Sequence, residues 1–208
     1  MKIEMKKYLN QRIATTDKNV DEKYLFCCIA DYFNVVGCKS TFVEKVHQFY
    51  IKYPSIFAGT LKKIEIADLQ IVNHDISTNQ TRLCFIQAKY KREQPRMLLD
   101  FEGNAFQWEL LRNRPNIIDE YNNGFPEDIL SFTNYKSISS FGIFYKDSEG
   151  KIDFLFSIPE KIEISQEKRK TSMNYSKYRI PGSINTIIKD EAYAIFSINE
   201  FGNLIQRN

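Results

Sequence analysis

Two segments in the middle of the chain are rich in apolar residues and are bounded by turn-forming residues, a pattern typical of β-strands. They read Ile64-Glu65-Ile66-Ala67-Asp68-Leu69-Gln70-Ile71-Val72 and Thr81-Arg82-Leu83-Cys84-Phe85-Ile86-Gln87-Ala88-Lys89-Tyr90. Residues 73–80 between them are rich in turn formers, so the sequence predicts strands over 64–73 and 81–90 that pair as a hairpin. The first strand carries an acid, Asp68, and the second carries Gln87 and Lys89 two residues apart.

Asp68, Gln87 and Lys89 are predicted to converge on one small site. Side chains two residues apart on a strand share a face, so Gln87 and Lys89 project together and Asp68 would meet them from the neighbouring strand. The Asp68 carboxylate, the Gln87 amide oxygen and the main-chain carbonyl of Ala88 are oxygen ligands, which Mg²⁺ prefers. Lys89 can position a water molecule or stabilise charge on a phosphate. Metal-dependent hydrolysis of a phosphodiester needs these roles.

The Gln-x-Lys spacing alone is weakly specific, because five acid-or-glutamine triplets of this form occur in the chain. Only Gln87 and Lys89 lie within a predicted strand that follows another strand with an acid. The alternative is a strand end that emerges into solvent, with the Lys89 ammonium at the surface. Periodicity leaves both interpretations open.

The remaining elements follow from apolar periodicity and turn residues. Helices are predicted over 20–36, 41–53 and 104–113, with a short one after the turn-rich residues 122–126. Further strands are predicted over 140–145, 152–158 and 193–198, and the polar residues 165–183 are predicted to be a loop. This order predicts a single domain over residues 1–208, of mixed α/β (α+β) class, with a central mixed β-sheet flanked by helices.

Composition sets further limits on function. The net charge of +3 neither requires nor excludes nucleic acid. The four cysteines form no Cys-x-x-Cys pair and there are two histidines, so a zinc site is not expected. The cysteine pattern, the absence of a secretory signal in residues 1–7 and the absence of a long apolar run predict a cytoplasmic protein without a membrane span.

At Ala67-Asp68 and Gln87-Ala88-Lys89 the sequence resembles the PD-(D/E)xK nuclease superfamily. It is most similar to type II restriction endonucleases in which glutamine replaces the second acid, with eighteen residues between Asp68 and Gln87. Ala67 stands where the family name has proline. The order helix, strand, hairpin and helix over residues 20–113 also suits the family core.

The resemblance implies a restriction-endonuclease-like core and a Mg²⁺-dependent endonuclease that acts on double-stranded DNA, as a restriction or other defence enzyme. Asp68 and Gln87 would bind the metal and Lys89 would assist the attacking water. The family often adds a glutamate from an upstream helix. Glu22 and Glu44 are the candidates, and Glu22 is included in the expected metal site. Each also has a structural explanation, as a first-turn acid and as a capping-box residue with Thr41.

Two groups of basic residues are candidate DNA contacts. Lys91, Arg92 and Arg96 follow the expected site, and Lys168, Arg169 and Lys170 lie in the predicted polar loop. A solvated strand end and a surface loop explain the same residues. Cleavage of both strands would imply two active sites and hence a homodimer. The alternative outside enzymes is a catalytically silent nuclease-like module that binds DNA or a protein.

Overall fold

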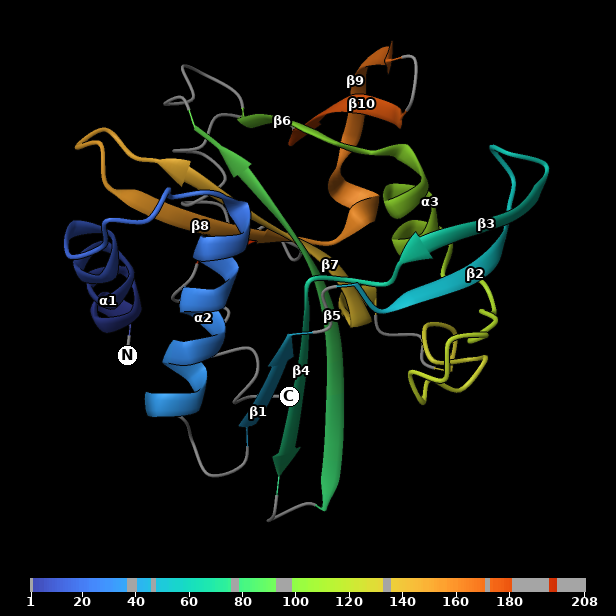
Figure 1. Ribbon diagram of the computed structural model, residues 1–208, viewed down its shortest axis with the longest axis horizontal. Helices are drawn as coiled ribbons and strands as arrows, with labels where there is room; N and C mark the ends of the chain where they lie inside the picture. Colours follow the sequence, from blue (N-terminus) through green and yellow to red (C-terminus); the bar gives the residue numbers. More distant parts are fainter. Residues whose placement is uncertain are drawn as a thin grey trace.

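The computed structural model describes residues 2–36, 41–45, 48–75, 79–92, 99–132, 136–170, 173–180 and 195–197 (Figure 1). Three α-helices lie in these ranges: α1 (Lys2–Ala14), α2 (Glu22–Val36) and α3 (Ala105–Asn113). None of the helices in the described ranges is long and apolar enough to cross a membrane.

The largest sheet has six strands and is mixed, as predicted. In spatial order these are β1 (Thr41–Lys45), β4 (Leu69–Asp75), β5 (Gln80–Lys91), β7 (Ser139–Lys146), β8 (Ile152–Ser157) and β11 (Ile195–Ser197). Strands β5 and β7 are parallel, and the other neighbours are antiparallel. The chain between β5 and β7 therefore crosses from one end of the sheet to the other.

Two smaller sheets flank this one (Figure 1). The first is the hairpin of β2 (Tyr50–Ser55) and β3 (Thr60–Glu65). The second has the order β6 (Leu99–Asn104), β10 (Met173–Ile180) and β9 (Glu163–Lys170). Short 3₁₀ turns at Lys136–Ile138 and Pro159–Lys161 lead into β7 and β9.

Alternating side chains of the central strands divide the core into clusters on the two faces of the sheet. On β7, Phe144 packs with residues of α1 and α2. Its neighbours Ile143 and Tyr145 pack instead with α3, β6 and β10. A third cluster joins the β2–β3 hairpin to α3 and to Phe85 of β5. The sheet is thus covered by helices on one face and by α3 with the β6–β10–β9 sheet on the other.

Several predicted elements are confirmed. The helices predicted over 20–36 and 104–113 are α2 and α3, and the Asn104 side chain caps α3 by accepting a bond from the Phe106 N–H. The hairpin predicted over 140–158 is β7–β8. The strand predicted over 81–90 is β5 and forms a hairpin with β4, as expected. The strand predicted over 64–73 is divided, because residues 64 and 65 end β3, which pairs with β2, and β4 begins only at Leu69. The strand predicted over 193–198 is present as β11 in the residues of that range that are described, 195–197.

The helix predicted over 41–53 was wrong where these residues are described. Residues 41–45 form β1 and residues 50–53 belong to β2, so Thr41 and Glu44 form no capping box. In β2, the fully buried Ile51 and Tyr53 alternate with more exposed neighbours, a period of two that pairing with β3 stabilises. The aromatic and β-branched side chains that suggested a helical stripe suit a strand equally well.

Residues 165–183 were also predicted wrongly where they are described. Residues 165–170 and 173–180 are strands, because main-chain pairing of β9, β10 and β6 organises a polar sequence. Tyr178 anchors the sheet, fully buried between the rings of Phe101 and Trp108. The short helix expected after residues 122–126 is absent from 126–132, which form turns. Helix α1 was not predicted.

Candidate functional site

Asp68 lies at the point where β4 begins, one residue before the first paired residue of that strand. Leu69 pairs with Ile86, so the next position outward on each strand brings Asp68 opposite Gln87. The Asp68 N–H donates to the Ile86 carbonyl at 3.0 Å. Its carboxylate turns back to β5, where Oδ2 accepts bonds from the Ala88 N–H at 2.7 Å and from Gln87 Nε2. Asp68 and Gln87 are both buried.

An open edge of β5 explains this arrangement. Strand β5 continues to Lys91, beyond the start of β4, while β7 pairs with its other edge. Alternate N–H groups on the β4 side of this extension therefore lack a strand partner. The Asp68 carboxylate accepts from Ala88, and the Glu22 carboxylate accepts from Tyr90. Two acids from different elements thus replace the missing strand.

Glu22 is the first residue of α2, where the helix dipole favours a negative charge. Its Oε1 lies 3.3 Å from Lys89 Nζ. Burial, together with the negative charge of Asp68, raises the pKa of Glu22, and the Lys89 ammonium opposes that rise. Both acids therefore belong to one electrostatic cluster with Lys89.

Lys89 is buried, with 8% of its surface exposed, so it is not a lysine that emerges at a strand end. Strand β6 covers it at Gly103: a Cβ atom there would lie 3.7 Å from Lys89 Cε and 3.2 Å from the Tyr178 ring. Gly103 permits this close approach of backbone to side chain. The sequence reasoning gave Gly103 no role, although an isolated glycine in a strand signals such an approach.

The residues expected to converge are brought together. Asp68 and Gln87 are hydrogen-bonded, Ala88 donates to the same carboxylate, and Glu22 reaches the site through Lys89. Glu44, the other upstream candidate, lies on β1 opposite Gln70 and belongs to no helix.

The donor atoms of this cluster fit a hard cation. Gln87 Oε1 is buried and has no hydrogen-bond partner within the described part of the chain, a state that normally costs about 1–3 kcal/mol. Since the N–H and C=O of one strand residue point to the same edge, the Ala88 carbonyl lies on the open edge with Asp68. Carboxylate, amide and carbonyl oxygens are the ligand set that Mg²⁺ takes. Within the described ranges no three His, Cys, Asp or Glu side chains form a metal cluster, so a site here depends on the amide and carbonyl oxygens.

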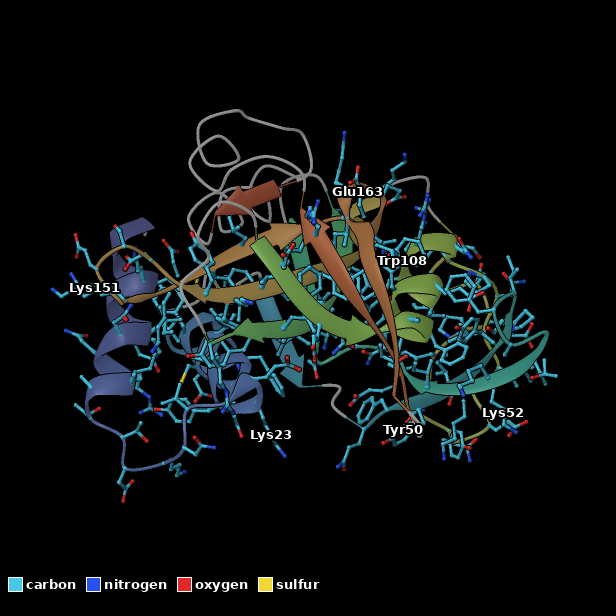
Figure 2. All side chains as sticks on the ribbon, turned by 90° about the horizontal axis from the view of Figure 1, so that it is seen from above. Lys23, Tyr50, Lys52, Trp108, Lys151 and Glu163 are labelled. Carbon is cyan, nitrogen blue, oxygen red and sulfur yellow. The ribbon has the colours of Figure 1, made fainter. Side chains whose placement is uncertain are left out.

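The expected DNA contacts are distributed over two elements. Lys91 ends β5 and the exposed Arg92 follows it, whereas Arg96 lies outside the described residues. Residues 168–170 lie on β9, opposite residues 173–175 of β10, and not in a loop. Their sheet includes β6, which passes over Lys89, but β10 lies between β6 and β9. The first basic group therefore follows the site directly, and the second lies two strands away from the strand that covers it. Figure 2 views the molecule from this end, where β6, β9 and β10 cross in front of the sheet.

Comparison of the chain with protein-family models, curated proteins and solved structures found no match. The support for a function therefore comes from the geometry of the site.

Proposed function

We propose that this chain is a Mg²⁺-dependent endonuclease that hydrolyses phosphodiester bonds in double-stranded DNA, as a type II restriction enzyme or another cytoplasmic defence nuclease. One observation carries the proposal: two acids, a lysine and a buried glutamine with an unpartnered amide oxygen meet at the open edge of β5. The mixed sheet, with α2 supplying the glutamate, agrees with a restriction-endonuclease-like core.

Asp68, the Gln87 amide oxygen, the Ala88 carbonyl and Glu22 would hold the metal. A bound Mg²⁺ would supply polarisation of the phosphoryl oxygen and a lowered pKa for a water ligand. Lys89 brings a positive charge into a water-poor setting, where it can donate hydrogen bonds to a phosphate oxygen or orient the attacking water. Glu22 holds the Lys89 ammonium in place.

The test is cleavage of supercoiled plasmid DNA in Mg²⁺ by the wild type and by Asp68→Ala and Lys89→Ala. Each substitution should lower the cleavage rate at least ~100-fold, since each removes a group that acts on the charged phosphate. Lys23→Ala is the matched control, because Lys23 is an exposed cation of α2 next to Glu22 (Figure 2). Discrete fragments would indicate a restriction enzyme and a smear a nonspecific nuclease. Equal cleavage by Lys89→Ala and Lys23→Ala would contradict the assignment.

A second candidate is a catalytically silent module that binds DNA or a protein. The observation in its favour is that Asp68 Oδ2 already accepts two hydrogen bonds, which is a sufficient structural reason for the acid. DNA binding without cleavage by the wild type, over varied sequences and in Mg²⁺, would support this candidate. Sedimentation of the protein with and without DNA would test the homodimer that double-strand cleavage implies.

A further inference from the structure

The β2–β3 hairpin carries an unusual share of the exposed apolar surface. Of the eight large hydrophobic residues that are exposed among the described residues, six lie on this hairpin or on the segment beside it. They are Tyr50, Ile56, Phe57, Leu61, Ile118 and Tyr121. Ile56 and Phe57 occupy the turn between the strands and are 79% and 54% exposed. Figure 1 shows this turn projecting away from the six-stranded sheet.

The same hairpin is positively charged. Lys62 lies 4.2 Å from the centre of the Phe106 ring, and Lys63 lies over the rings of Tyr50 and Tyr121. Neither ammonium group has a carboxylate partner within the described part of the chain, whereas Lys52 pairs with Glu120. The aromatic rings hold the two lysines while leaving their charge uncompensated.

A buried acid fixes the turn rigidly. Glu109 of α3, 1% exposed, accepts bonds from the Ile56 and Phe57 N–H groups at 2.6 and 2.9 Å and from the Tyr53 and Ser55 hydroxyls. The Phe57 ring also stacks on Trp108, 6.2 Å between centroids. The two most outward apolar side chains of the hairpin are therefore presented on a braced backbone, which lowers the entropic loss on binding.

We infer that the β2–β3 hairpin is a DNA-binding wedge, with Ile56 and Phe57 inserted between base pairs and Lys62 and Lys63 on the flanking phosphates. Apolar side chains that enter a base step and lysines that neutralise phosphates are the two parts of such an interface. A second copy of the chain fits less well, because a twofold contact through this face would oppose the lysines of one copy to those of the other. The inference rests on the proposed function, for which it names a DNA contact separate from the cluster at Asp68.

The test compares wild type with the double variant Ile56→Ser/Phe57→Ser on closed circular plasmid in EDTA, where cleavage does not interfere. The plasmid is relaxed by a topoisomerase that needs no metal, the protein is removed, and the linking number is measured. An inserted wedge unwinds DNA, so wild type should shift the topoisomer distribution and the double variant should not. Affinity for a mixed-sequence duplex at low salt should fall about tenfold, the usual effect of losing one stacking side chain.

Both serine substitutions keep the N–H groups that donate to Glu109, so the turn remains braced. Phe132→Ser is the matched control, since Phe132 is 57% exposed and far along the chain from the hairpin. Lys62→Gln/Lys63→Gln should reduce the slope of log affinity against log salt by up to about 2, at 0.9 for each phosphate contact.

The outcomes separate the wedge from the nuclease. The inference is supported if the double variant no longer unwinds DNA while Phe132→Ser unwinds it as wild type does. Unwinding or affinity equal to wild type in the double variant overturns it, and if plasmid cleavage in Mg²⁺ is intact the proposed function survives. Wild type that neither binds nor cuts DNA overturns both. If the wild-type protein binds phosphatidylserine vesicles but not DNA, the wedge is overturned and the hairpin is identified as a membrane-binding surface instead.

Discussion

Gln87 is the residue on which the proposed metal site depends, because its amide nitrogen and its amide oxygen have different surroundings. Nε2 donates to Asp68, while Oε1 is buried and has no partner among the residues that the structure describes. Because the Gln87 amide is neutral and donates to the buried Asp68 carboxylate, the fold is stable without a cation. An acid at the same position would bind a cation more strongly and would destabilise the empty site.

Gln87→Glu is therefore expected to lose stability in EDTA and to recover it in Mg²⁺. The new carboxylate would face Asp68, removing a donor and adding a like charge, at a cost of about 2–4 kcal/mol. Metal binding to the folded state alone restores stability by mass action. Urea unfolding with EDTA or with excess Mg²⁺ measures both effects.

Gln87→Met is the control for this prediction, since it removes the same hydrogen bond without adding charge. Mg²⁺ should not restore its stability. If Mg²⁺ left Gln87→Glu as unstable as it is in EDTA, the cluster would not be a metal site.

The sequence predicted the central part of the site because Asp68, Gln87 and Lys89 lie on two strands joined by a short turn. Local pairing alone brings them together. Glu22 reaches the site only through the packing of α2 on the sheet, so no spacing rule could distinguish it from Glu44. Glu109 gave no signal, since its partners lie more than fifty residues earlier in the chain.

At the scale of the elements, Glu109 joins α3 to the β2–β3 turn. Burial and the neighbouring carboxylate raise the pKa of Tyr53, so its hydroxyl remains a donor to Glu109. Glu109→Gln replaces one accepting oxygen by a donor that faces two N–H groups or two hydroxyls. We expect a loss of about 2–3 kcal/mol, since charge-assisted bonds are replaced by a repulsive contact.

Hydrogen exchange should locate the effect of Glu109→Gln in residues 50–65, with α1 and α2 protected as in wild type. Glu149→Gln, a change of the same type at a 68% exposed side chain, should leave exchange unchanged. Uniform loss of protection over the whole chain would argue against a local brace.

Helix α1 is joined to the β7–β8 hairpin by an ion-pair cluster in addition to apolar packing. Lys6 lies 2.8 Å from Asp147 and 2.9 Å from Asp153. Partial burial alone would raise the pKa of Asp147, but Lys6 and the N–H groups of Lys151 and Glu149 outweigh it and hold the pKa below its usual value. The stability from this group is therefore complete above pH ~4, the ordinary value for aspartate, and is lost as pH falls through the lower folded value.

Asp147→Asn should thus reduce the free energy of unfolding by about 1 kcal/mol at pH 7 and by less as the pH falls below ~4. Urea unfolding of both proteins across this range measures the difference. A deficit that stays constant with pH would show that hydrogen-bond geometry, and not charge, attaches α1.

The sequence predicted elements that had a local signal, such as α3 with its Asn104 cap. The sequence-based prediction was wrong where pairing with a distant strand decided whether a segment is a helix, a strand or a loop. Val43 and Tyr53 suit one face of a helix or a strand equally, and their partners on β4 and β3 decided between the two. The polar β9 and β10 had no apolar alternation, so only their pairing with β6 shows that they are strands.

For the molecule as a whole, Gly142 at the centre of the sheet allows the core to pack tightly, because it has no Cβ atom. A Cβ atom there would lie 2.5 Å from Phe154 Cζ and 3.0 Å from Ile86 Cγ2. Gly142→Ala should lower global stability by about 1–3 kcal/mol through overpacking. Denaturant unfolding measures this loss.

A second substitution tests the cause of that loss. In Gly142→Ala/Phe154→Leu the smaller side chain makes room, so the two changes should cost less together than the sum of the separate changes. Gly150→Ala, in open space at a φ of +76°, should cost only the strain of its backbone, about 1 kcal/mol, and should not respond to Phe154→Leu. Additive costs for Gly142→Ala and Phe154→Leu would exclude their steric conflict.

The two acids that complete the open edge of β5 affect how descendants of this protein would evolve. Asp68 and Glu22 satisfy main-chain groups of the sheet, so a lineage that lost the proposed catalysis would still be under selection to keep them. Among the described residues Lys89 Nζ donates to Glu22 and to no main-chain group, so loss of the proposed activity would release the lysine from selection first. Across homologues, the inheritance of the lysine, and not of the acids, would distinguish working enzymes from folds that only retain their shape.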